Sequence, residues 1–276
     1  MGSSLRSLTH PTILASLRLS SGQAWRENEV NVVLVNNVDN ATAALLADLH
    51  SSDKPTIRAA VDRLIELAAA APALVEKLNH LLDESPAERQ WPTAYILARL
   101  PYPSAKVFAI LLNALDHPEP DIRWAVMLLL ARLGKTDIGI VRLLLELRKT
   151  GTPTQRRMAI YCIRDLKLTD AAGLQGLLDS LSDDDAAVRV AAVTSLIGRT
   201  DIDPSGRKML YELFVNDPDL KVRNAAAVTL AQLGSPSEEF LAALKKAEMS
   251  EHAQLRKAAT AALAILQKRR SAPAGG

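Results

Sequence analysis

Apolar and polar residues follow one another along most of the chain with the period of amphipathic helices. Six stretches carry this pattern, and each is followed by a short turn rich in Asp, Pro, Ser or Gly: residues 73–82, 105–115, 138–147, 174–181, 208–214 and 238–244. A second stretch then begins, in which apolar residues recur at positions −1, +3 and +7 around an arginine. These positions share one face of a helix. The pattern therefore predicts a series of helical hairpins.

The second stretches are copies of one motif, and each copy is anchored by its arginine. The seven anchors are separated by 31, 34, 33, 33, 34 and 33 residues: Arg58, Arg89, Arg123, Arg156, Arg189, Arg223 and Arg256. The residue seven positions after each arginine is always Ile or Leu. The residue two positions after it is Ala in five copies, with Trp91 and Met158 as exceptions. Because a hairpin cannot bury its apolar face alone, such units must stack.

The sequence thus predicts an all-α fold, an α-solenoid of about seven hairpins. We expect the repeat domain to span residues 39–268, with an N-terminal extension or cap at 1–38, partly disordered, and a disordered tail at 269–276. The first 26 residues contain no acid and are rich in Ser and Arg. Such a composition is typical of organelle-targeting segments, but it also suits a plain extension. We therefore expect a cytoplasmic protein, with organelle import as the alternative.

The repeat motif resembles a known family. An acid in the turn, the arginine after an apolar residue, and the late Leu or Ile resemble the HEAT repeat, most closely the short variant named after phycobilisome lyases. The resemblance implies that the seven anchor arginines form a structural ladder with carboxylates and carbonyls of the turns. Three acids lie six residues before an anchor: Asp83, Asp183 and Asp217. The fourth repeat has no acid at this place, so its turn is either looser or bound by a partner.

Composition narrows the possible classes of protein. Hydrophobic residues make up 48% of the chain but aromatic residues only 4%, which favours packed aliphatic helices over a β-sandwich. The single cysteine excludes an intrachain disulfide and fits a reducing compartment. No apolar run approaches the roughly 20 residues that span a bilayer. Since 33 basic residues are balanced by 31 acidic ones, composition does not indicate a nucleic-acid partner.

The chain offers little that could carry out catalysis. Deoxyhypusine hydroxylases are enzymes with HEAT-like repeats, and their iron sites need His-Glu dipeptides. None of the five histidines of this chain is followed by Glu. No paired Cys or His spacing predicts zinc, and Cys162 falls in the predicted core. We therefore predict no catalytic residue, no cofactor and no metal. Two enzyme-like alternatives remain from the family: a bilin lyase subunit and an alkylpurine DNA glycosylase.

The resemblance implies that the second helices line the concave side of the stack. Outward positions on these helices are apolar or basic in the middle repeats: Trp124, Leu128, Arg157, Tyr161, Arg164, Val190 and Ile197. Trp, Tyr and Arg dominate interface hot spots. We therefore predict a non-enzymatic interaction module or assembly scaffold that binds a protein partner here. The competing interpretation is that tight curvature buries these side chains between repeats.

Overall fold

The computed structural model describes residues 40–168, 171–234 and 236–271 of the chain. These residues form helices joined by turns, and no strand occurs among them. The predicted extension at 1–38 and the last residues of the predicted tail lie outside the described part. The all-α fold is confirmed. Contacts divide the chain after Glu66 into two compact units, which we describe separately.

The first unit holds one helical hairpin in its described part. Residues 40–48 are helical, and α2 (Lys54–Ala68), of which residues 54–66 belong to this unit, carries the first anchor arginine. Asp53 precedes α2 and accepts hydrogen bonds from the main-chain N–H and the hydroxyl of Thr56, at 3.0 and 2.5 Å. These hydrogen bonds, that of the hydroxyl first, lower the pKa of the Asp53 carboxyl. The carboxylate therefore closes the first turn of α2.

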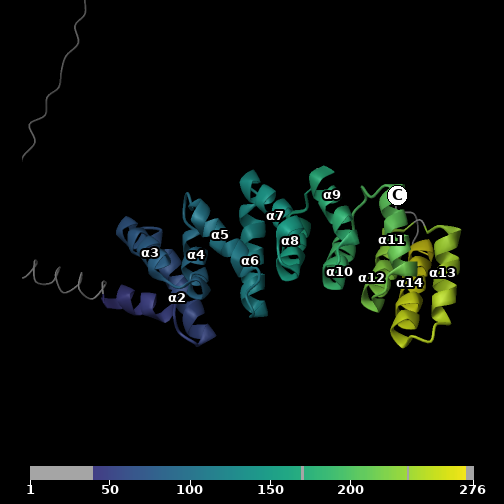
Figure 1. The fold of residues 1–276 in the computed structure, drawn as a ribbon, viewed down its shortest axis with the longest axis horizontal. Coiled ribbons are helices and arrows are strands. Elements are labelled where there is room, and N and C mark those ends of the chain that lie inside the picture. The colour runs from purple at the N-terminus through teal and green to yellow at the C-terminus, as the bar shows by residue number, and fades with distance from the viewer. Residues whose placement is uncertain (1–39, 169–170, 235, 272–276) are drawn as a thin grey trace, which may run out of the picture. The chain divides into compact units, whose positions relative to one another are not determined.

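The second unit begins at Leu67, and within its described residues six hairpins follow one another in sequence order (Figure 1). The first helices of the hairpins are α3 (Pro72–Glu84), α5 (Ala105–Ala114), α7 (Ile138–Thr150), α9 (Ala171–Asp179), α11 (Pro204–Asn216) and α13 (Glu238–Glu248). The second helices are α4 (Trp91–Leu97), α6 (Pro120–Leu133), α8 (Pro153–Leu166), α10 (Ala186–Ser195), α12 (Leu220–Leu233) and α14 (Ala253–Ser271). Two short 3₁₀ turns, η1 (Ala87–Arg89) and η2 (Ser180–Ser182), precede α4 and α10.

Polar side chains in the turns cap the N-termini of the helices that follow them. The Asp185 carboxylate accepts from the N–H groups of Ala187 and Val188 at the start of α10. Thr152 and Gln155 form a reciprocal capping box at the start of α8. Each cap satisfies main-chain donors that the first turn of a helix leaves free.

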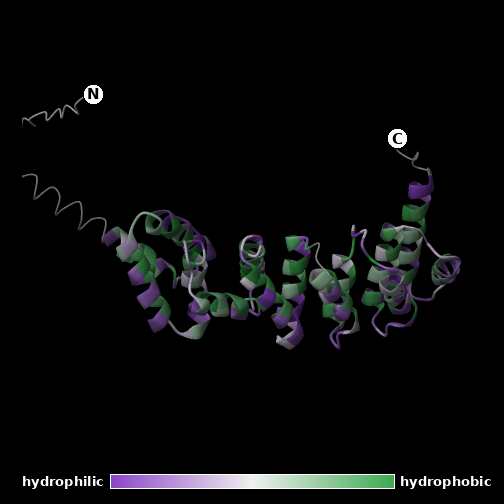
Figure 2. Cartoon of the chain, turned by 90° about the horizontal axis from the view of Figure 1, so that it is seen from above, coloured by the Kyte–Doolittle hydropathy of each residue, from purple (hydrophilic) through white to green (hydrophobic). Residues whose placement is uncertain are grey.

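The repeating apolar columns form the core of the second unit. The late Ile or Leu is buried in α4, α6, α8 and α12, and directly after α10. Successive second helices pack on one another from α6 to α14, and each first helix packs on its own partner. Hydrophobic positions gather between helices and hydrophilic ones on outer faces and turns, as at the last turn of α14 (Figure 2). Each hairpin thus buries its apolar face against its neighbours, as stacking requires.

Two elements depart from the regular pattern. Arg89 lies in η1, because Pro92 lacks an N–H and so favours a helix start, and α4 begins only at Trp91. The ring of Trp91 packs edge-on against His117, with ring centroids 6.1 Å apart. At the other end, α14 continues through Ser271, past residue 268, where the sequence predicts the end of the repeat domain. None of the described helices combines the length and apolarity that a membrane span requires.

Candidate interaction surface

The anchor arginines connect consecutive hairpins. Arg156 donates two hydrogen bonds to the Asp183 carboxylate, at 2.8 and 2.7 Å, and Arg189 binds Asp217 in the same way, at 2.8 and 2.9 Å. Each arginine also donates to carbonyls of its own turn: Arg156 to Gly151 O and Arg189 to Asp183 O. Two of the three acids that lie six residues before an anchor, Asp183 and Asp217, therefore bind the anchor of the preceding repeat, whereas Asp83 pairs with Lys106. The bidentate pairs join α8 to the turn before α10, and α10 to the turn before α12.

The other anchors make fewer contacts. Three of them donate only to carbonyls: Arg123 to His117 O and Pro118 O, Arg223 to Phe214 O, and Arg256 to Ser250 O and Glu251 O. The guanidinium groups of Arg58 and Arg89 have no hydrogen-bond partner within the described residues. The structure therefore places five of the seven anchors in the turns, where their guanidinium groups tie main chain together.

Asp183 has a perturbed carboxyl group. Burial acts to raise its pKa, but the hydrogen bond from Arg156 and then that from Asp185 N, with the charges of Arg156 and Arg189, outweigh burial and lower it. The same hydrogen bond raises the pKa of Arg156, and the bond to Asp217 raises that of Arg189. The Arg156–Asp183 pair therefore stays charged at neutral pH.

The turn of the fourth repeat, which lacks an acid, is closed by other means. The capping box of Thr152 and Gln155 replaces the missing carboxylate locally. The amide of Gln155 also donates to Leu112 O, 3.2 Å away in the preceding hairpin. A neutral amide thus makes the cross-repeat contact that a charged pair makes elsewhere.

The predicted partner-binding residues lie on consecutive second helices, and three of them touch. The rings of Trp124 on α6 and Tyr161 on α8 stack with centroids 5.4 Å apart and an interplanar angle of 15°. The Arg164 guanidinium lies 5.0 Å from the Tyr161 centroid, within the range of a cation–π contact. Trp124 is 42% exposed and Leu128 57% exposed. We call these four residues, together with Ile197, the second-helix patch.

The remaining predicted residues, Ile197, Val190 and Arg157, differ in how far they are exposed. Ile197 follows α10 and is 42% exposed, and it lines a cavity of about 520 Å³ together with Arg164 and Arg199. Val190 is half-buried and packs against the core of the unit, and Arg157 is half-buried at the start of α8. The structure therefore gathers five of the seven predicted residues, and Val190 belongs as much to the core as to the surface.

One part of this face escaped the sequence reasoning. Tyr95 and Arg99 line a cavity of about 210 Å³ together with Leu128 and Arg132, so that the patch continues from α6 toward α4. A signal for it was present, since an arginine recurs near the end of four successive second helices: Arg99, Arg132, Arg164 and Arg199. This column stands outside the anchor motif, which is why the repeat alignment did not draw attention to it.

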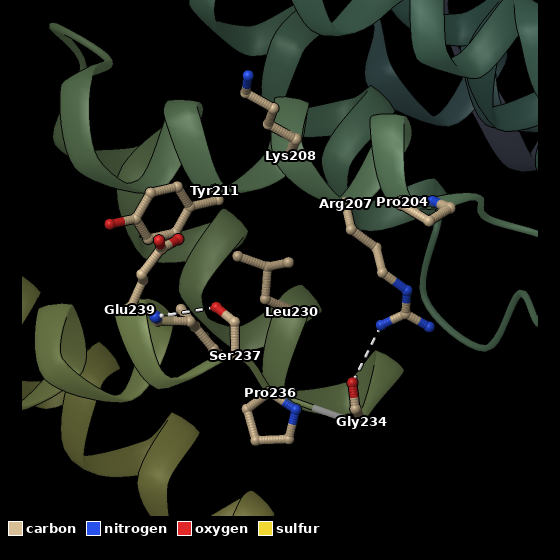
Figure 3. A pocket seen from close by; sticks show the side chains of 10 residues that line it. Pro204, Arg207, Lys208, Tyr211, Leu230, Gly234, Pro236, Ser237 and Glu239 are labelled. Atoms are coloured by element: carbon tan, nitrogen blue, oxygen red, sulfur yellow. Dashed lines mark hydrogen bonds between the residues drawn. The ribbon is translucent and has the colours of Figure 1, made fainter.

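A further cavity, of about 320 Å³, lies among α11, α12 and α13 (Figure 3). Arg207 reaches across it and donates to Gly234 O at 3.0 Å. The Ser237 hydroxyl accepts from Phe240 N and thereby caps α13. The side chain of Lys208 extends away from the rest of the lining in this view. The hydrogen bonds of Arg207 and Ser237 therefore hold the local fold together.

Cys162, the one cysteine, is fully buried on α8. Desolvation raises the pKa of its thiol, and its Sγ lies 3.6 Å from Met127 O. Among the described residues, no three His, Cys, Asp or Glu side chains are grouped so that they could hold a metal ion. The patch is therefore the candidate site.

The chain matches a known family of repeat proteins in sequence. The family model for HEAT repeats matches residues 108–196 and 174–264. The chain belongs to the HEAT-repeat family. The matched hairpins run from α5 to α14 and contain both bidentate rungs of the HEAT-repeat ladder. No curated protein matches the chain in sequence.

Solved structures are similar to the chain in fold. YibA of Escherichia coli is 17% identical, with a TM-score of 0.50, and the match covers 82% of this chain and 92% of that one. Human deoxyhypusine hydroxylase also matches, with 14% identity, a TM-score of 0.34 and coverage of 87% and 99%. A designed armadillo repeat protein in complex with the peptide (KR)4 is 17% identical, with a TM-score of 0.34 and coverage of 81% and 98%. The predicted helical repeat solenoid is confirmed.

Proposed function

We propose that the chain is a non-enzymatic protein–protein interaction module, or an assembly scaffold, that binds a partner through the second-helix patch. The observation that carries the proposal is the stack of Trp124 and Tyr161, which spans two repeats and remains open to solvent at Trp124. The patch lies within the repeat domain. We place this domain at residues 39–268, between the extension at 1–38 and the tail at 269–276. We place this activity in the cytoplasm, where the single cysteine stays reduced.

The composition of the patch supports binding. Large apolar side chains that stay exposed on neighbouring elements mark interaction sites more often than chance placement does. Trp124, Leu128 and Ile197 are each more than two-fifths exposed. Burial of a side chain of this size contributes about 1.5–3 kcal/mol when it moves fully from water. Together the three side chains offer the apolar centre that an interface requires.

The patch is also held in place before any partner arrives. The Tyr161 ring is held by its contacts with both Trp124 and Arg164. Arg164 is itself fixed, because its Nε donates to the Asp165 carboxylate at 2.8 Å. Since side chains that are already ordered lose little entropy on binding, this arrangement favours affinity. Exposure of Trp124 and Leu128 argues against the interpretation that they are simply packed between repeats.

Paired substitutions test the proposal. Trp124→Ala combined with Tyr161→Ala removes the stack, while Ile138→Ala combined with Met249→Ala removes two exposed apolar side chains from other surfaces. Proteins captured by the wild-type chain and by the control variant, but not by the patch variant, are then purified and titrated. We expect at least a roughly thirtyfold rise in Kd for the patch variant, the effect of losing a hot spot.

The melting temperature separates binding from folding. Both variants should melt close to the wild-type chain, because the substituted side chains are partly exposed. Equal capture by the two variants overturns the proposal. A large fall in melting temperature for the patch variant alone instead assigns Trp124 and Tyr161 to the core and overturns it as well.

A further inference from the structure

The cavity between α4 and α6 contains two guanidinium groups whose charge is not compensated. Arg99 and Arg132 both line it, and both side chains are exposed. Neither guanidinium group has an ion pair or hydrogen bond with any residue that the structure describes. Among the lining residues the remaining three, Tyr95, Leu128 and Leu129, carry no charge. The cavity thus presents two positive charges against an apolar wall.

The other arginines at the ends of second helices differ in this respect. Arg164 donates to Asp165, and Arg199 forms a bidentate pair with Asp201. The pKa of Asp201 is lowered, first by its hydrogen bond with Arg199. Of the four arginines in this column, Arg99 and Arg132 are therefore the two that form no ion pair with a described residue.

The helix geometry places this charge beside the second-helix patch. Trp124, Leu128 and Arg132 follow one another at intervals of four residues on α6, so they lie along one stripe of the helix. Tyr95 and Arg99 repeat the same spacing at α4 and the turn after it. An apolar surface and a pair of guanidinium groups are thus continuous across two repeats.

The cavity exists because α4 ends early. α4 spans only Trp91–Leu97, and it packs less closely on α6 than the later second helices pack on one another. The resulting space of about 210 Å³ lies below the roughly 300 Å³ at which pockets for drug-sized ligands begin. It suits a single side chain that a longer ligand inserts.

We infer that the partner supplies an acidic peptide segment, one carboxylate of which binds between Arg99 and Arg132 while a neighbouring apolar side chain packs on Trp124 and Leu128. Two guanidinium forks can give one carboxylate several charge-assisted hydrogen bonds. This inference rests on the proposed function, and it names the chemistry of the partner. The apolar wall favours a peptide over a nucleic acid, whose phosphates would use only the arginines.

A display experiment tests the inference without a known partner. A library of random peptides on phage is selected on the immobilised full chain, and the enriched sequences are read. We expect Asp or Glu next to Leu, Phe or Trp in the enriched peptides. The best of them is synthesised with a fluorescent label, together with a version in which the acids are replaced by amides, and titrated by fluorescence anisotropy.

Three variants locate the carboxylate. R99Q and R132Q should each weaken binding about tenfold, as the loss of a hydrogen bond to a charged group does. R142Q removes an exposed arginine from α7, outside this face, and should change nothing. The amide peptide should bind weakly to the wild-type chain and lose little more on R132Q, since the two changes remove the same contact.

Each outcome decides one of the two proposals. Neutral or basic enriched peptides that depend on Trp124 overturn the acidic inference and leave the proposed function intact. Acidic peptides that need Arg132 but bind equally well to the Trp124→Ala, Tyr161→Ala variant overturn the patch instead. A labelled thymidine oligonucleotide that binds more tightly than the peptide, with the same dependence on Arg132, assigns the arginines to nucleic acid and overturns the inference. A library that yields no binder counts against both.

Discussion

Substitution of Asp217 by asparagine tests whether the ion pairs between repeats stabilise the stack. Asp217 accepts two hydrogen bonds from Arg189 and one from Asp219 N, at 2.8, 2.9 and 2.8 Å. Its side chain is only 2% exposed and that of Arg189 11% exposed. Asparagine keeps the shape but turns an NH₂ group toward the donors of Arg189. A guanidinium that is almost fully buried is then left without its counter-charge.

The structure allows the size of the effect to be worked out. Removal of one partner from a buried ion pair costs about 3–5 kcal/mol. The asparagine side chain would retain one acceptor oxygen, so we expect the lower end, a loss of about 3 kcal/mol in the free energy of unfolding. Asp83 provides a matched control, because it pairs with Lys106 on the surface, with side chains 64% and 49% exposed. Asp83→Asn should cost less than about 1 kcal/mol.

Urea unfolding followed by far-ultraviolet circular dichroism measures both variants. A cycle with Arg189→Met then isolates the pair, since the double variant lacks both charges and should recover part of the loss. Equal destabilisation by Asp217→Asn and Asp83→Asn, or additive effects in the cycle, would falsify the reasoning, because burial would then not decide the strength of the pair.

Three further predictions follow from the same contacts. The lowered pKa of Asp183 means that its stabilising contribution is complete above the ordinary carboxyl pKa of about 4 and is lost as the pH falls through the lowered value. The stability difference between the wild-type chain and Asp183→Asn should therefore stay constant down to about pH 5 and shrink only in stronger acid; a difference that shrinks already near neutral pH contradicts this. Burial of Cys162, which raises its thiol pKa, predicts that Ellman's reagent reacts only in concentrated urea, and rapid reaction of the native chain would refute it. Thr152→Ala removes half of the capping box with Gln155 and should cost about 1 kcal/mol in urea unfolding, whereas no change would show that the turn of the fourth repeat is held by other contacts.

Much of the fold could be predicted because the apolar positions recur at fixed distances from each anchor arginine and so define the buried face of each second helix. The spacing of the anchors placed the second helices, and the polar turns placed the boundaries between them. Arg89 shows the limit of this reasoning. Its copy aligns with the others, but Pro92 fixes a helix start that leaves Arg89 in a 3₁₀ turn. Local covalent chemistry there outweighed the periodic pattern.

The contacts between repeats were beyond the reach of spacing alone. The sequence shows that Asp183 lies six residues before Arg189, yet its carboxylate binds Arg156 of the preceding hairpin. The stacking offset that brings the two together arises only when whole hairpins pack. The cavity at Arg99 and Arg132 was missed for the same reason, because it depends on how far α4 extends beside α6.

The two bidentate rungs divide the repeat array into firmer and looser stretches. They tie together the hairpins of α7–α8, α9–α10 and α11–α12, whereas the described hairpins before α7 have no such pair. In an array of nearest-neighbour contacts, local opening then begins at the less connected hairpins and stops at the tied ones. The second-helix patch and the α4–α6 cavity straddle this border. A ligand bound there would connect the two stretches and suppress local opening of the hairpins before α7. Amide hydrogen exchange in α4 and α5 would then slow when the ligand binds.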